Sequence, residues 1–347
     1  MKHMIVVGAG ILGASLAYHL ANRGIKVTVI DKGHPASGAT GSSFGWIHTT
    51  VRDDAPDALL RCASVMDWQR LEKEIPELWV NWTGALSYDD DSLKSQPAEN
   101  LLRQPEISRL EPALNNPPQQ AYYANHDGAV DPIEATRVLL DKACSLGATL
   151  KSQTPVIGFI RTGNNVTGIE TPEGVLNADC VVLTCGIGIT PLLNGIGIQL
   201  PILVSPAILL RYSTENHLIN TLISGHDMEV RHTRNGDILA AEDYPLSGNT
   251  DEVAVDLLAA MKTGLKGAAS VRLLSQSVGQ RPVPEDGCPV IGFLDDTKGV
   301  YVVVMHPAVT CAATVGRMVS EELLSGNNPE IPASYRPTRF LSDQKCR

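Results

Sequence analysis

The first thirty residues change from one hydrophobic period to another and back. Apolar residues run without interruption at 5–7 and again at 27–30, and the segment between them has a helical spacing that ends at Gly24. Short buried strands are typically continuous apolar runs, whereas an amphipathic helix repeats every 3.6 residues. The pattern therefore predicts a strand, a glycine-rich turn, a helix and a second strand, which together form one βαβ unit.

The same alternation returns later in the chain. Asp131 stands at an N-cap position, with Pro132 at the first helical position and Glu134 placed as in a capping box. The helix predicted there ends at Gly147. Five short buried strands alternating with helices predict a parallel, doubly wound α/β sheet. The later elements of this pattern are strands at 148–151, 181–184 and 300–304 and a helix at 307–324.

Other segments have the texture of antiparallel strands. They lie at 208–213, 229–233 and 237–241, and an Asn235-Gly236 turn joins the last two. Because predicted parallel strands lie on both sides of them in sequence, the α/β domain should be discontinuous. We expect a Rossmann-like domain with a parallel sheet and an inserted α+β domain with a mainly antiparallel sheet. The first is assigned residues 1–80, 127–201 and 277–347, and the second residues 81–126 and 202–276.

Composition and charge narrow the class of protein. The 347 residues are 43% hydrophobic and 19% charged, and the formal net charge is −10. This balance is typical of a globular protein and argues against a nucleic-acid partner, whose backbone needs a basic surface. The seven cysteines form no Cys-x-x-Cys pair and no zinc-like spacing, so we expect no metal site and a reducing compartment.

Membrane insertion is not expected. Residues 1–4 precede only three apolar residues before Gly8, too few for the hydrophobic region of a signal peptide. Residues 180–210 carry no charged side chain, but glycines and prolines divide them into pieces shorter than the roughly 20 apolar residues of a bilayer helix. We expect a cytoplasmic protein, with a peripheral membrane contact as the minor alternative.

The turn of the βαβ unit contains the segment Gly8-Ala9-Gly10-Ile11-Leu12-Gly13, and Asp31 closes the second strand. In such a turn the first glycine permits the tight bend, the second lets the backbone approach a pyrophosphate, and the third allows close helix packing. The helix N-terminus faces the phosphates, and the acidic residue accepts from a ribose hydroxyl. The segment predicts a dinucleotide site, and it leaves FAD and NAD both open.

The residues after Asp31 favour FAD. Segment 37–48 is a loop of small and hydroxyl residues that ends in aromatics, and small residues let a bulky planar group lie close. It resembles the segment along pyrophosphate and flavin in the D-amino-acid-oxidase-like family of FAD proteins, which includes glycine oxidase and sarcosine oxidase. Segment 279–292 looks like the family's Gly-x-Arg-Pro…Asp-Gly-x-Pro-x-Ile-Gly signature, and segment 299–306 is similar to its closing strand.

The resemblance implies FAD as cofactor and a set of residues that bind it. Because the cysteine that tethers flavin in sarcosine oxidases falls near Gln280, it implies noncovalent FAD. The implied FAD-binding residues are Gly8, Gly10, Ile11, Leu12, Gly13, Asp31, Lys32, Gly38, Ala39, Thr40, Ser42, Ser43, Phe44, Gly45, Trp46, Val156, Cys185, Gly186, Met305, His306, Pro307, Ala308, Val309 and Thr310.

Two departures from the family pattern bear on function. The family usually has Gly-His-Ser-Gly where this chain has the segment 305–308, Met-His-Pro-Ala, so a glycine and a backbone donor are missing. Pro307 is acceptable in a first helical turn, so the helix is still expected to point at the flavin. Glycine oxidases carry a substrate-contacting tyrosine on the strand where Glu229 aligns. This substitution argues against glycine as the substrate.

Flavin oxidation of an amine needs few side chains, because the α-C–H passes as hydride to the cofactor. A guanidinium can hold a substrate carboxylate through two parallel hydrogen bonds, and the resemblance places Arg281 beside the flavin. His48 and His306 are the other catalytic candidates, and each has the alternative of a structural role. Strand alternation lets only one of Arg231 and His232 face the substrate. The substrate-binding candidates are Arg281, His48, Glu229 and Arg231.

The leading hypothesis is an FAD-dependent oxidoreductase that oxidises the C–N bond of an amino acid or secondary amine to an imine, which then hydrolyses. One alternative is an FAD-dependent 2-hydroxy-acid dehydrogenase, which needs a base for the hydroxyl proton. Another is an FAD-stabilised subunit of a hetero-oligomeric dehydrogenase, suggested by the altered segment 305–308. The expected partners are the small-molecule substrate and either oxygen or an electron carrier, and both homo- and hetero-oligomers stay open.

Overall fold

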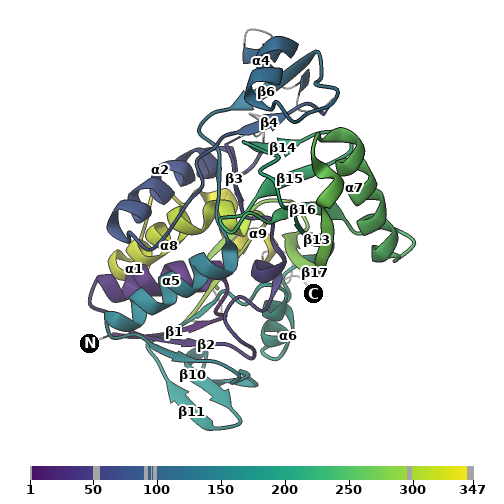
Figure 1. The fold of residues 1–347 in the computed structure, drawn as a ribbon. Helices are drawn as coiled ribbons and strands as arrows, with labels where there is room; N and C mark the ends of the chain where they lie inside the picture. The colour runs from purple at the N-terminus through teal and green to yellow at the C-terminus, as the bar shows by residue number, and fades with distance from the viewer. Residues whose placement is uncertain are drawn as a thin grey trace.

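The computed structural model describes residues 2–49, 55–89, 93–94, 96, 100–294 and 299–341. A six-stranded and an eight-stranded sheet form its two main layers, and helices lie along their outer sides (Figure 1). The six-stranded sheet draws its strands from both ends and the middle of the chain.

The six-stranded sheet has the order β18-β19-β12-β1-β2-β8. Neighbouring strands from β19 to β8 run parallel, whereas β18 is antiparallel to β19. This confirms the predicted parallel sheet. The strands are β1 (His3–Val7), β2 (Lys26–Ile30), β8 (Thr149–Lys151), β12 (Cys180–Leu183), β18 (Val290–Phe293) and β19 (Val300–Val304).

Helices cover one face of this sheet. Val6, Val182 and Val303 pack there in one core with residues of α1 (Ile11–Asn22), α2 (Ala58–Glu74), α5 (Pro132–Ser145) and α8 (Ala308–Ser325). The opposite face packs against α6 (Ile189–Asn194) and a small antiparallel sheet. That sheet consists of β9 (Gly158–Thr162), β10 (Asn165–Thr171) and β11 (Gly174–Asn177), and β10 and β11 project below β1 and β2 in Figure 1.

The prediction of a doubly wound sheet was therefore wrong for the second face. Val166 and Ile169 of β10 reach the six-stranded sheet and share its second core. An antiparallel sheet can cover apolar residues on one of its faces and leave the other to solvent. Here it replaces most of the helices of a second layer.

The eight-stranded sheet has the order β17-β13-β16-β15-β14-β4-β6-β5. Its strand pairs are antiparallel except for the parallel pair of β14 and β4. The predicted fold class, a Rossmann-like domain with a mainly antiparallel second sheet, is confirmed. The strands are β4 (Ala85–Ser87), β5 (Leu101–Arg103), β6 (Gln120–Ala124), β13 (Ile202–Ser213), β14 (Leu222–Ser224), β15 (Glu229–His232), β16 (Ile238–Asp243) and β17 (Arg272–Pro284).

The two faces of this sheet have different neighbours. Leu210, Val230 and Ala240 lie in a core with residues of helix α7 (Thr250–Gly264). Leu209 and Leu239 point the other way and pack with Phe44 from the loop after β2. The remaining elements are α4 (Gln104–Leu110), α9 (Thr338–Leu341), β3 (Trp46–Ile47), β7 (Gly128–Ala129) and the 3-10 helices η1 (Ala39–Ser42), η3 (Gly186–Gly188), η4 (Ala268–Ser270) and η5 (Ala333–Tyr335).

Local signals placed the long helix of the middle region correctly. The Asp131 side chain accepts hydrogen bonds from the backbone N–H groups of Ile133 and Glu134, as its N-cap position predicts. Glu134 pairs with Arg137 at 2.6 Å rather than completing a capping box. The domain boundaries stay a prediction, although β17 runs unbroken through the boundary drawn after residue 276.

The fold also contains a buried histidine whose ionisation state depends on pH. His19 of α1 is 2% exposed. Its Nδ1 lies 2.8 Å from the carbonyl of Ser15, and Arg70 donates to its Nε2 over 3.1 Å. This arrangement suits the neutral ring, and burial, assisted by the charges of Arg70 and Arg23, lowers the pKa of His19 to about 4.

We therefore expect acid to destabilise the fold through His19. A lowered folded-state pKa gives stability that is present above pH 6.5 and is lost as the pH falls toward 4, here about 3 kcal/mol. Urea unfolding at pH 7, 6 and 5 should show a steeper loss for the wild type than for His19→Gln, whose amide can donate to Ser15 and accept from Arg70. Exposed His126→Gln serves as the control. Parallel curves for wild type and His19→Gln would contradict this assignment.

Candidate active site

The fingerprint turn is closed by packing at two of its glycines. Gly8 has a φ of +111°, and a Cβ built on it lies 2.7 Å from the Cα of Cys185. A Cβ on Gly13 would stand 1.9 Å from the carbonyl oxygen of Gly8. Both positions therefore require glycine whether or not a ligand is bound, and they bring the start of α1 against the end of β12.

Gly10 differs, because the space beside it is largely open. Its added Cβ would meet only the Oγ1 of Thr40, at 3.0 Å. As the N-cap of α1, Gly10 offers no capping side chain, and Thr40 accepts from the N–H of Ile11 over 3.2 Å. The N-terminus of this helix and a loop hydroxyl thus converge where a pyrophosphate would lie.

Asp31 organises the other side of the turn. Its carboxylate accepts from the N–H of Ala9 at 2.6 Å and from the N–H of Gly33 at 2.8 Å. Each oxygen has a second lone pair, so the ribose contact stays a prediction. The other residues predicted to bind the adenosine half lie near Asp31. Lys32 follows it directly, and Val156 comes soon after Thr154, whose N–H donates to the Asp31 carbonyl. Cys185 and Gly186 follow β12.

The loop of small residues runs from this turn to the eight-stranded sheet. It contains Gly38, Ala39, Thr40, Ser42 and Ser43, and most of it forms η1. A Cβ on Gly279 of β17 would lie 3.0 Å from the Cβ of Ser42. The loop continues through Phe44 and Gly45 into β3, and the Trp46 indole donates to Asp127 over 2.9 Å.

Arg231 holds this loop in place, and its contact with the substrate stays a prediction. Its guanidinium donates to the carbonyls of Phe44 and Val130, each at 2.8 Å, and lies 5.3 Å from the centroid of the Phe44 ring. The side chain is 3% exposed. Strand alternation was predicted correctly, since Arg231 faces the loop while His232 accepts from the N–H of Leu218. The arginine's donors, however, are used by backbone carbonyls.

The N-terminus of helix α8 lies beside β3, at the end of the loop 37–48. Met305 and His306 lead from β19 to Pro307, which is the N-cap of the helix rather than its first residue as predicted. No side chain caps this end within the described part of the chain, so the N–H groups of Ala308, Val309 and Thr310 are left for a ligand. The Thr310 hydroxyl donates to the carbonyl of Trp46 over 2.8 Å, which ties α8 to β3.

Two predicted catalytic residues lie close to an arginine that sequence reasoning missed. His48 is hydrogen-bonded to Arg61 of α2, which also pairs with Asp57 at 2.8 Å. The His306 residue is exposed to solvent, but protein atoms surround much of its ring and desolvate it. Desolvation and the charges of Arg281 and Arg61 lower the pKa of His306 to about 4. Near pH 7 this imidazole is neutral and can accept a hydrogen bond.

Arg281 lies between His306 and a recess on the sheet. Its Nε donates to the carbonyl of Ser205 at 3.2 Å, and its Nη2 bonds the Ser205 hydroxyl at 2.9 Å and Asp243 at 3.2 Å. Its Nη1 donates to no described residue, and the side chain is 30% exposed. Nη2 also lies 3.3 Å from the Pro206 carbonyl, so β13 and β16 hold the arginine through Nε and Nη2 and leave Nη1 to meet a ligand.

The recess beside Arg281 has a volume of about 280 Å³. Glu229 and Ala241 lie on the sheet face that also carries Arg231 and meets Phe44, because side chains two residues apart share a face. The recess therefore lies on the sheet face that meets the loop 37–48, rather than on the face that packs against α7. Its lining residues are Ala207, Ser224, Gly225, His226, Met228, Glu229, Ala241, Glu242, Asp243 and Arg281.

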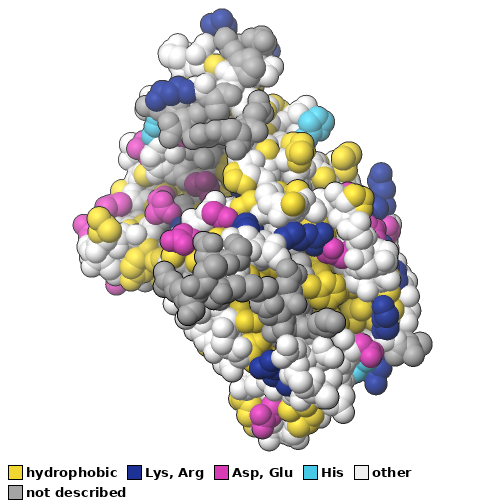
Figure 2. Space-filling view, turned by 180° about the vertical axis from the view of Figure 1, so that it is seen from behind, with side chains coloured by type: hydrophobic (Ala, Val, Ile, Leu, Met, Phe, Trp, Pro, Cys, Tyr) yellow, Lys and Arg dark blue, Asp and Glu magenta, His cyan; other side chains and the backbone are white. Residues whose placement is uncertain are grey.

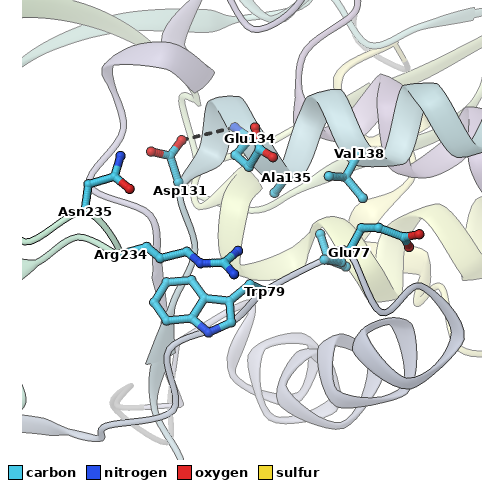
Figure 3. A pocket seen from close by; sticks show the side chains of 9 residues that line it. Glu77, Trp79, Asp131, Glu134, Ala135, Val138, Arg234 and Asn235 are labelled. Atoms are coloured by element: carbon cyan, nitrogen blue, oxygen red, sulfur yellow. Dashed lines mark hydrogen bonds between the residues drawn. The ribbon is translucent and has the colours of Figure 1, made fainter.

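A second recess, of about 340 Å³, lies where α5 begins. Figure 3 shows the Arg234 side chain beside the Trp79 ring, and its guanidinium carbon is 5.4 Å from the ring centroid. Asp131 in its wall is the N-cap of α5. Its arginine and two of its carboxylates, Asp131 and Glu134, thus already have partners within the protein.

Sequence reasoning missed Arg61, Asp243 and Ser205. Arg61 carries one local signal, its i, i+4 spacing from Asp57 at the start of α2. Asp243 and Ser205 carry none, because they meet Arg281 only through pairing across β13, β16 and β17. Their roles depend on strand register, which a single sequence does not fix.

The surface, the titratable groups and the helices add three observations. On the face seen in Figure 2, the described Lys and Arg side chains lie among acidic and apolar ones and form no broad basic surface. Among the described residues no cluster of His, Cys, Asp and Glu could hold a metal ion. No described helix is both long and apolar enough to cross a membrane.

Comparison with known proteins agrees with this geometry. The family model DAO, described as FAD dependent oxidoreductase, matches residues 3–322. Glycine oxidase of Pseudomonas aeruginosa is 26% identical over 98% of this chain and 100% of its own length. The crystal structure of L-proline dehydrogenase from P. horikoshii has a TM-score of 0.87 at 24% identity, covering 99% of this chain and 98% of that one. Glycine oxidase from Bacillus cereus has a TM-score of 0.84 at 21% identity, covering 95% and 97%.

Proposed function

The chain belongs to the DAO family of FAD-dependent oxidoreductases, and from this we propose that it oxidises the C–N bond of an amino acid or another amine. Glycine oxidases and a dimethylglycine dehydrogenase, whose names state amine substrates, are among its relatives. Hydride leaves the α-carbon with the bond's electron pair, the nitrogen loses a proton, and water then hydrolyses the imine to a carbonyl compound and a free amine.

The N-termini of α1 and α8 both suit parts of FAD. The open space beside Gly10 and the start of α1 suit a pyrophosphate, and the N–H groups at the start of α8 suit an electron-rich ring edge. When bound, FAD supplies the hydride acceptor. The chain's own residues hold it through η1, which Arg231 and Gly279 keep close to the eight-stranded sheet.

The observation that carries the proposal is the position of Arg281. Arg281 lines the recess, its Nη1 donates to no described residue, and its charge acts on neutral His306. A carboxylate held by Arg281 would orient the α-carbon, and neutral His306 could accept a hydrogen bond from the substrate's amine. His48 is proposed to act through Arg61 and to border the substrate from the α2 side.

A second candidate is the oxidation of a 2-hydroxy acid, whose hydroxyl could donate a hydrogen bond to neutral His306. A panel of amino acids, secondary amines and 2-hydroxy acids, mixed anaerobically with the purified protein, separates the two. We expect the amines to bleach the flavin absorbance. Bleaching by hydroxy acids alone would replace the proposal with the second candidate, and an inert isolated chain would favour the subunit of a hetero-oligomer. Reoxidation is assigned to oxygen or an electron carrier.

We also expect the FAD to be held without a covalent bond. Gln280, which has no nucleophilic side chain, stands near the place of the tethering cysteine of sarcosine oxidases. Denaturation in acid should release all of the yellow chromophore, and its mass should be that of unmodified FAD. Flavin that stays with the precipitated polypeptide would contradict this prediction.

A further inference from the structure

The recess beside Arg281 contains more negative than positive charge. Glu229, Glu242 and Asp243 line it, and Arg281 is the one Lys or Arg among its lining residues. Asp243 pairs with Arg281 at 3.2 Å. Among the described residues neither glutamate forms an ion pair with a Lys or Arg, and Arg281, whose charge also acts on Glu229, is already paired with Asp243.

Glu229 is the carboxylate that its acidic neighbours affect most. It is partly buried, and its carboxylate has no hydrogen bond or ion pair with any described residue. Burial raises the pKa of Glu229 to about 7, and the charges of Glu242, Asp243 and Asp89 act in the same direction. The pKa of Glu242 is raised as well, by burial and by Asp243.

A carboxylate in such a place costs stability unless a cation meets it. The recess is also lined by Arg281, the proposed carboxylate ligand, so that cation can come from the substrate. Building on the proposed function, we propose that the substrate is an amino acid with a second positively charged group, which Glu229 binds while Arg281 takes the carboxylate.

The size of the recess agrees with this assignment. At roughly 30 Å³ for each water, its volume of about 280 Å³ holds about nine waters. A diamino acid with a three- or four-carbon side chain has a similar number of heavy atoms. One end of such a molecule would meet Arg281 near His306, and the other would reach Glu229 on β15.

The test uses matched pairs of compounds with the FAD-loaded protein. Each pair has equal chain length and differs only in a terminal ammonium: ornithine with norvaline and lysine with norleucine, in both stereoisomers. Anaerobic stopped-flow gives the apparent Kd and the limiting rate of flavin bleaching. Titration of the oxidised protein, followed by shifts in the flavin spectrum, gives binding independently of turnover.

We expect the cationic member of a pair to bind at least tenfold more tightly at pH 8. Glu229→Gln should remove most of this preference and change the Kd of the neutral member by less than threefold. The matched control is Glu215→Gln, an exposed carboxylate outside the recess. The preference should fall below pH 7, where Glu229 becomes protonated among Glu242, Asp243, Asp89, His226 and Arg281.

Each result decides something different. Equal binding within the pairs, or a preference that survives Glu229→Gln, overturns the cationic substrate while bleaching by neutral amino acids still supports amine oxidation. Cationic compounds that bind through Glu229 but never bleach the flavin support the recess and overturn the proposed reaction. If no amine binds or bleaches, both fail.

Discussion

Arg281→Met is expected to keep its FAD and to lose about 2–5 kcal/mol of transition-state stabilisation, the scale for truncating one member of a buried charge pair. For a substrate with a carboxylate this lowers the rate of flavin bleaching at low substrate by roughly 30-fold to 5,000-fold. The reason is geometric: β13 and Asp243 fix the guanidinium through Nε and Nη2, so its Nη1 can hold a carboxylate in one orientation.

Three comparisons make this prediction specific. Arg281→Lys should recover only part of the rate, because an ammonium cannot form the planar two-point contact. The loss should shrink for amines without a carboxylate. Arg272→Met, at an exposed arginine on the same strand that bonds backbone carbonyls, should behave as the wild type. Equal losses for substrates with and without a carboxylate would assign Arg281 to structure alone.

Gly10→Val is expected to give a folded protein that lacks FAD. The added Cβ meets only the Oγ1 of Thr40, so the turn itself can accept it, but the valine methyl groups would occupy the space of the pyrophosphate. Overpacking costs about 1–3 kcal/mol, so the Kd for FAD should rise by about fivefold to 150-fold. The measurement is the flavin-to-protein absorbance ratio after purification and dialysis.

Gly158→Val is the matched control, because a Cβ at Gly158 makes only ordinary contact with Glu170, at 3.4 Å, on a strand away from the cleft. It should purify with full FAD content. Far-ultraviolet circular dichroism should show both variants folded. A Gly10→Val protein with wild-type FAD content would mean that the fingerprint turn has another role.

Local patterns predicted the parts of this protein that depend on local physics. The βαβ unit, the Asp131 N-cap and the helix after β19 follow from hydrophobic period and capping residues. Pro307 illustrates the limit of such signals, because it was placed one position too far into its helix. Element boundaries depend on backbone angles that propensity alone does not settle.

The rest depended on tertiary contacts. The sheet of β9, β10 and β11 was missed, since it reaches the main core through few apolar residues, among them Val166 and Ile169. The role of Arg231 depended on which backbone carbonyls lay within its reach. The partners of Arg281 come from two other strands, so nothing near it in sequence announces them.

The most direct test of C–N oxidation counts the products of one turnover. The FAD-loaded protein is mixed without oxygen with an amino acid that bleaches its flavin, and the amine released after denaturation is measured against the flavin reduced. We predict one equivalent of ammonia, or of the free amine for a secondary amine substrate, together with one equivalent of the corresponding oxo acid. Flavin reduction with no release of amine would contradict the account.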